Sequence, residues 1–336
     1  MLRGHFGEAI LIRLLSLARI SQVNATALSL TAAAFILSSS LVCAQSPNTG
    51  ARPNFNLPAE TAGIDAIAKT LIATFDQVDM LALGEAHERK IDSDLRLAII
   101  RNPEFARKAR AVVIECGSQA EQETLDAYIE GKSVPSTRLA KVWKTTRNGE
   151  GFCNSPMYLE FLAAIRQINF QLPADKRIQV FGGEPGPGEK RTTIDVLRRA
   201  LQNYGKVLII YGAAHFYLTG PADYLESSGD IGLAAKLSIE YPGRTLSVIP
   251  IGALARPGAV SDDTEPDFSK FDRAIKTPVR PVLLSLQRIP FSHLMASEFL
   301  GRTLTTCRGK EGCRSVFKGS PLTLGQMADA AVYLGR

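Results

Sequence analysis

Uninterrupted runs of apolar residues recur along this chain, and four of them run into a glycine or an acidic residue. These four runs lie at 78–84, 111–117, 177–184 and 206–212. Apolar runs of this length without polar alternation are typical of β-strands that are buried on both faces. Two further runs, at 246–251 and 282–286, have the same character. The pattern predicts a sheet whose strands are enclosed by other elements.

Segments with apolar positions at helical spacing separate these strands. They cover 61–75, 91–109, 119–131, 157–170 and 193–203, with Pro103 marking a break or a new helix start. The tail, 323–334, fits a helix or a short strand, and 133–155 and 256–281 are expected to be loops. Because strands and helices alternate, we expect an α/β fold, with a mainly parallel β-sheet covered by helices on both faces.

The first 44 residues differ in character from the rest of the chain. An apolar stretch from about residue 27 to 42 leads into Val42-Cys43-Ala44, the pattern of a signal-peptide cleavage site. Residues 45–60 are expected to be a linker and 61–336 a single α/β domain. Two alternatives stay open: an uncleaved anchor, for which the run is short, and a lipoprotein attached through Cys43. We expect a periplasmic or secreted protein with no stable membrane insertion after cleavage near Ala44.

Composition narrows the class of protein. Of the 336 residues, 45% are hydrophobic and 21% are charged, as in an ordinary globular protein with a large core. The formal net charge is +6, but the basic residues are scattered without a block of five or six. A nucleic-acid partner is therefore not indicated.

Four cysteines follow the leader, an even number that suits disulfides in an oxidising compartment. Cys307 and Cys313 flank a Gly-rich polar loop and predict a local disulfide. Cys116 with Cys153 would be the other pair by elimination. A cysteine metal site is the alternative, but the chain has no CxxC spacing to support it.

Titratable residues gather where the predicted strands end. They are Glu85, His87, Glu115, Glu184 and His215. Parallel strands of an open α/β sheet bring their carboxyl ends to one edge, where ligands bind. If the strands are neighbours, these five side chains converge on one crevice; if they are not, each side chain has a structural role.

Three chemistries suit such a cluster. Glu85, His87, Glu115 and His215 could activate water for attack on an ester or amide carbonyl. With Glu184, the same residues could instead hold a divalent metal. His215, with Tyr211 or Tyr217 nearby, could ligate haem iron.

Other motifs are absent or incomplete. The chain has no GxSxG, which argues against an ordinary serine hydrolase. The segments 131–133 and 183–190 lack the spacing of a phosphate-binding P-loop, and His87-Glu88 is not followed by the second histidine of a zinc-protease helix. His293 follows a strand-like run and is expected to be a surface or packing residue.

Three motifs together resemble a known group of proteins. They are Gly84-Glu85-Ala86-His87 after an apolar strand, Val113-Ile114-Glu115 on the next strand and Gly212-Ala213-Ala214-His215 on a later one, and they resemble motifs of the erythromycin esterase, ChaN and TIKI/TraB superfamily. The tail 329–334 also resembles the closing strand of the esterase branch. One residue separates Glu85 from His87, as in the ChaN-like branch, whereas the esterases have two. The resemblance covers roughly residues 61–336.

This resemblance implies an α/β core that hosts different functions. They are ester hydrolysis by a His-activated water, haem binding by exported lipoproteins and metal-dependent proteolysis. We therefore expect an exported hydrolase that activates water with a Glu-poised histidine, directly or through a divalent metal. The alternative is an exported haem- or metal-binding protein of ChaN-like type without turnover. The expected partner is a small-molecule substrate or haem.

Overall fold

An eight-stranded sheet organises the chain in a computed structural model. The model describes residues 54–147, 149, 151, 153–186, 190–221, 232–252, 268–300, 305–307, 313–315, 317 and 319–335. The predicted signal segment, 1–44, and most of the predicted linker lie outside the described residues. Residues 51–336 form one compact unit.

The sheet has the strand order β1-β7-β10-β6-β2-β5-β3-β4. Its strands are β1 (Glu60–Ala62), β2 (Met80–Glu85), β3 (Ala111–Ser118), β4 (Gln179–Glu184), β5 (Val207–Gly212), β6 (Thr245–Ile251), β7 (Val282–Ser285) and β10 (Ala330–Tyr333). Strand β7 is antiparallel to both of its neighbours, β1 and β10, and the other pairs are parallel. The predicted mainly parallel α/β sheet is confirmed.

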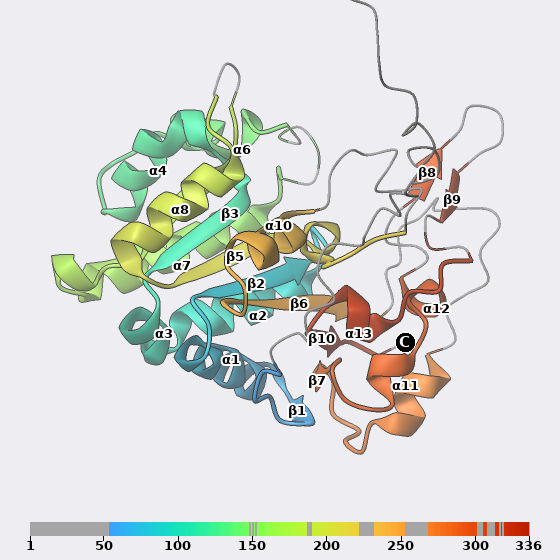
Figure 1. Cartoon of the computed structure of the whole chain (residues 1–336). Helices are drawn as coiled ribbons and strands as arrows, with labels where there is room; N and C mark the ends of the chain where they lie inside the picture. Colours follow the sequence, from blue (N-terminus) through green and yellow to red (C-terminus); the bar gives the residue numbers. More distant parts are fainter. Residues whose placement is uncertain are drawn as a thin grey trace, which may run out of the picture. The chain divides into compact units, whose positions relative to one another are not determined.

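Helices cover both faces of this sheet (Figure 1). One face packs against α1 (Ile64–Ala73), α2 (Lys90–Arg101), α3 (Pro103–Lys108), α4 (Gln122–Ile129), α5 (Ser136–Leu139), α6 (Lys141–Lys144) and α7 (Pro156–Gln171). The other packs against α8 (Thr193–Tyr204), α10 (Leu233–Glu240), α11 (Ser269–Ala274), α12 (Ala296–Phe299) and α13 (Leu324–Met327). None of the described helices is both long and apolar enough to cross a membrane.

Side-chain alternation explains why the strand sequences are apolar throughout. In β2, Leu81 and Leu83 pack into the core that contains α1 to α7, whereas Met80 and Ala82 pack into the opposite core. Each fully buried side chain of this size contributes about 1.5–3 kcal/mol relative to an exposed one. A polar residue on either face would lose that contribution, so only the carboxyl ends of the strands are free to carry charge.

Several predicted elements need correction. Residues 133–155, expected to be a loop, hold the short helices α5 and α6, and α11 lies inside the expected loop 256–281. The tail forms both of the alternatives predicted for it, α13 followed by β10. Pro103 begins a new helix, α3, which Asn102 caps through its side chain. Short elements such as β1 carry too few residues for a periodic pattern.

The structure describes one of the two predicted disulfides. Cys116 and Cys153 are bonded, with Cα atoms 5.1 Å apart, which confirms that pair. Cys307 lies opposite Cys313 in the small antiparallel pair of β8 (Thr305–Cys307) and β9 (Cys313–Ser315). The side chains of both residues fall outside the described part of the chain, so this second disulfide stays a prediction.

The side chain of Asn169 links the last turn of α7 to the backbone just before β4. Its buried amide accepts a hydrogen bond from Ile178 N–H and donates one to Ile178 C=O, both at 2.8 Å. We expect Asn169→Leu to lower the free energy of unfolding by about 2–4 kcal/mol, since two buried backbone groups lose their partners. Urea unfolding measures the change, and exposed Gln171→Ala is the control. Equal stabilities for the two variants would contradict the role of this amide.

Candidate functional site

The carboxyl end of β2 brings Glu85 and His87 together. The strand ends at Glu85, and the chain then turns through Glu88, whose φ of 64° lies in the left-handed region. His87 Nδ1 lies 3.1 Å from Glu85 Oε1 and 2.9 Å from the hydroxyl of Tyr158 in α7. The pair predicted from the sequence is therefore in contact.

Glu85 is a buried carboxylate with two further partners. Arg96 of α2 donates to Glu85 Oε2 at 2.6 Å, and the Tyr158 hydroxyl donates to Glu85 Oε1. The Arg96 guanidinium also lies over the Tyr158 ring, 4.4 Å from its centroid. Burial alone would raise the pKa of Glu85, but the charge of Arg96 and the hydrogen bond with His87 outweigh it and lower that pKa.

Glu115 lies between two histidines. Its Oε2 atom accepts a hydrogen bond of 2.6 Å from Gly212 N–H and lies 3.4 Å from His87 Nε2. Its Oε1 atom lies 3.5 Å from His215 Nε2. Burial opposes the charge on Glu115, but its hydrogen bonds with His215 and His87 dominate and hold its pKa well below the ordinary value. One ionised carboxylate is thus shared by both imidazoles.

The two histidines differ in exposure. The His87 side chain is 8% exposed, whereas that of His215 is 48% exposed. His215 lies on a short 3-10 helix, η4 (Ala213–Phe216), directly after β5, and its ring meets Tyr211 edge-on at 5.5 Å. Solvent or a ligand therefore reaches His215 first.

Both histidines have raised pKa values. Burial would lower the pKa of His87, but hydrogen bonds with Glu115 and Glu85 and the charges of both carboxylates raise it to about 9. Burial likewise opposes protonation of His215, and Glu115 outweighs it, so the pKa of His215 lies above 6.5. His87 is therefore an imidazolium at neutral pH.

Gly212 makes this close arrangement possible. A Cβ atom built at Gly212 would lie 2.7 Å from His87 Nε2 and 3.4 Å from Glu115 Oε2. Any side chain there would push His87 away from the shared carboxylate. The first glycine of the Gly212-Ala213-Ala214-His215 motif is thus required by the close approach of the end of β5 to His87.

The other predicted site residues lie differently. Glu184 is half-buried at the end of β4, where burial and the charge of Glu115 raise its pKa. Tyr211 and Tyr217 are buried in the core, 1% and 6% exposed. His293 lies on the surface on η5 (Phe291–His293).

The predicted metal ligands are the acidic residues and histidines of this cluster. Among the residues that the structure describes, no group of three or more His, Cys, Asp or Glu side chains could hold a metal ion. Glu85 accepts hydrogen bonds from Arg96 and Tyr158, and Glu115 accepts one from Gly212 N–H. The two carboxylates therefore already have protein partners in this structure.

Arg96 and Tyr158 were not identified from the sequence. Tyr158 lies on the apolar face of a helix and resembles a core residue. Arg96 lies four residues after Asp92 on the buried face that continues with Ile99 and Ile100. A cation on an otherwise buried helical face requires a partner, and this is the signal that could have pointed to it.

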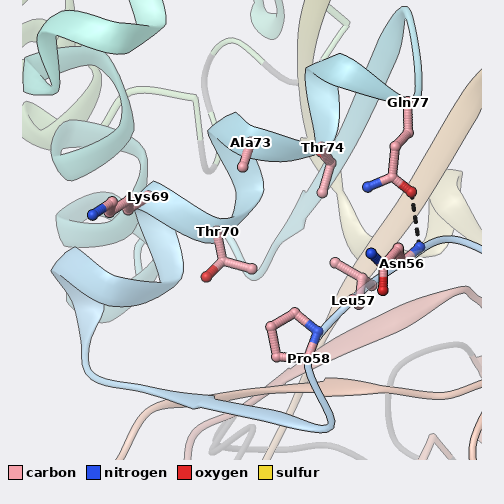
Figure 2. Close-up of a pocket in the computed structure, with 8 residues that line it drawn as sticks. All are labelled: Asn56, Leu57, Pro58, Lys69, Thr70, Ala73, Thr74 and Gln77. Carbon is pink, nitrogen blue, oxygen red and sulfur yellow. Dashed lines mark hydrogen bonds between the residues drawn. The ribbon is translucent and has the colours of Figure 1, made fainter.

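A separate cavity lies away from these residues. Its volume is about 310 Å³, and it is lined by Asn56, Leu57, Pro58, Lys69, Thr70, Ala73, Thr74 and Gln77. Figure 2 shows Gln77 closing one side through the hydrogen bond from Asn56 N–H to its side-chain oxygen. Lys69 is the only charged residue in this lining, so the cavity has little of the convergent chemistry of a site.

The amino-acid sequence matches one protein-family model. A family model described as haem-binding uptake, Tiki superfamily, ChaN, matches residues 71–174. The predicted superfamily resemblance is confirmed. The matched segment contains Glu85, His87, Arg96, Glu115 and Tyr158, and it ends before His215. The comparison with curated proteins found no match.

Two solved structures are similar to this chain. A protein from Bacillus cereus is 14% identical, with 82% of this chain and 92% of that chain covered and a TM-score of 0.52. An erythromycin esterase mutant, EreC in its open conformation, is 12% identical, with 81% and 96% covered and a TM-score of 0.47. At these identities the likeness concerns the fold alone.

The pKa of His87 predicts how stability depends on pH. A raised histidine pKa contributes stability that is complete below the unfolded value of 6.5 and is lost as pH rises through about 9. We expect the free energy of unfolding to fall by about 3 kcal/mol over this interval. Urea unfolding at several pH values measures it.

His87→Gln should remove most of this slope, whereas His293→Gln should keep it, because His293 is exposed and outside the cluster. A stability that stays flat from pH 6.5 to 9 in the unmodified protein would contradict a protonated His87.

Proposed function

We propose that this protein is a hydrolase in which His215 activates water for attack on an ester or amide carbonyl. The observation that carries the proposal is the buried Glu115 carboxylate, which faces His87 on one oxygen and the half-exposed His215 on the other. A carboxylate that orients a solvent-accessible imidazole is the arrangement used in general base catalysis.

The different exposure of the histidines assigns their roles. His87, with a pKa of about 9, is protonated at neutral pH and has no lone pair to accept a proton. Its role is to keep Glu115 ionised. His215 is accessible, and the tautomer that donates Nε2–H to Glu115 leaves the lone pair on Nδ1. His215 is therefore the base.

The reaction follows from these roles. His215 Nδ1 takes a proton from water, and the hydroxide attacks the carbonyl carbon to form a tetrahedral intermediate. When the bond to the leaving group breaks, the His215 imidazolium returns the proton to that group. Glu115 stabilises the imidazolium formed in the first step.

The proposal includes export from the cytoplasm. Support comes from the apolar leader before Ala44 and from the Cys116–Cys153 disulfide. Disulfides persist in oxidising compartments and are rare in the cytosol.

Haem binding without turnover is the second candidate, because the description of the matching family model names it. His215 is the exposed residue of the three predicted haem ligands and would hold the haem iron through its imidazole; the bound haem would supply the iron chemistry. Tyr211 and Tyr217 are buried and fit this role poorly.

Replacement of His215 tests the hydrolase proposal. We expect His215→Ala to lower kcat/KM for a chromogenic ester about 10²- to 10⁴-fold, the usual contribution of a general base. For the unmodified protein, kcat/KM should rise with pH through an inflection above 6.5, since the base must be neutral and its pKa is raised. His293→Ala is the matched control. Unchanged turnover in His215→Ala would remove this mechanism.

A hemin titration tests the second candidate. If the protein binds haem, hemin should give a shifted Soret band with one-to-one stoichiometry, and His215→Ala should lose this shift because the imidazole ligand is gone. Absorption spectroscopy of the purified protein provides the measurement. No Soret shift at stoichiometric hemin would exclude the haem candidate, whereas a shift that survives in His215→Ala would exclude His215 as its ligand.

A further inference from the structure

We propose that the Cys116–Cys153 disulfide holds the functional site in its working geometry, so that the site is complete only in the oxidised chain. The inference deepens the proposed function, because it concerns the assembly of the same site. It rests on where the two cysteines lie, one beside Glu115 and the other shortly before Tyr158.

The strand that carries Glu115 has an irregular pairing with β4 at that point. Among the strand pairs that the structure describes, β3 pairs with β5 up to Ile114, and with β4 up to Ile114 and again at Ser118. Glu115, Cys116 and Gly117 have no paired residue in either neighbour. The register shift between Ile114 and Ser118 marks a β-bulge or similar irregularity, so the backbone around Glu115 departs from regular pairing with β4.

Cys116 lies within this irregular stretch of β3 and links it to a second segment of the chain. Its side chain packs into the same core as those of Val112 and Ile114 and is 1% exposed. Side chains alternate along a strand, so Glu115 points away from this core while its neighbour is bonded within it. The covalent link thus restrains the backbone on one side of Glu115, and the hydrogen bond from Gly212 N–H restrains the carboxylate itself.

Cys153 fastens the approach to α7. Trp143 of α6 donates its indole N–H to Asn154 Oδ1 at 3.2 Å, and Ser155 caps α7 by accepting from Met157 N–H. Tyr158 follows in the first turn of α7 and bonds to both Glu85 and His87. Release of Cys153 would loosen the start of the helix on which Tyr158 depends.

The disulfide therefore connects the segment that carries Glu115 with the segment that leads to Tyr158. One end adjoins the carboxylate shared by His87 and His215, and the other leads to the hydroxyl that supports Glu85 and His87. Closure is a two-electron oxidation: two thiols lose two protons and two electrons to an oxidising disulfide, which becomes two thiols. Both sulfurs are buried, so the bond resists reductants once the chain has folded.

The test compares the oxidised protein with Cys116→Ala/Cys153→Ala. We expect the double variant to remain folded by circular dichroism, with ester kcat/KM lowered at least tenfold. Nuclear magnetic resonance titration of the histidines should show the pKa of His87 moving from about 9 toward its ordinary value. Phe271→Leu, which perturbs the opposite core, is the control for general destabilisation and should leave that pKa unchanged.

Two results would overturn the inference. An unchanged His87 titration in the folded double variant would show that the site assembles without the bond. A double variant that does not fold would show that the bond maintains the fold and not the site in particular. If the His87 titration moves as expected but the oxidised protein hydrolyses no ester, the inference stands and the proposed hydrolase function fails.

Discussion

The buried carboxylate of Glu115 is the charge on which the rest of the site depends. An isolated carboxylate removed from water is very costly, so it must be paired with cations and hydrogen-bond donors. Gly212 N–H, His87 and His215 supply these partners from two other segments of the chain. Because each partner lies at or just beyond the end of β2 or β5, the carboxylate links the carboxyl ends of β2, β3 and β5.

Charge balance then explains the residues around it. His87 carries a positive charge between Glu85 and Glu115, and Arg96 forms an ion pair with Glu85. Two acids and two cations form the buried part of the cluster, and His215 lies at its exposed edge. The different roles proposed for the two histidines follow from this difference in burial, since both face the same carboxylate.

Much of the fold was predictable because its signals are local. The apolar runs of β2, β3, β4 and β5 and the helical spacing of α7 lie within short windows of sequence, and glycine or acidic residues mark where strands end. Tyr158 was missed because an aromatic residue on the apolar face of a helix resembles a core residue, and Arg96 because it lies in a helical segment with many charged residues. The short helices α5 and α6 were missed because four residues are too few to show a period.

The sequence by itself determined the order and type of the main elements, the mainly parallel sheet and the placement of Glu85, His87, Glu115 and His215 near strand ends. Tertiary structure decided which of these ends are neighbours. Strand β5 enters between β2 and β3, so Gly212 lies where only a hydrogen atom fits beside His87, and His215 reaches Glu115. The physical reason is that the pattern of apolar residues depends on positions close together in the sequence. Strand order and the pairing of buried charges arise only when segments that are distant in the sequence pack together.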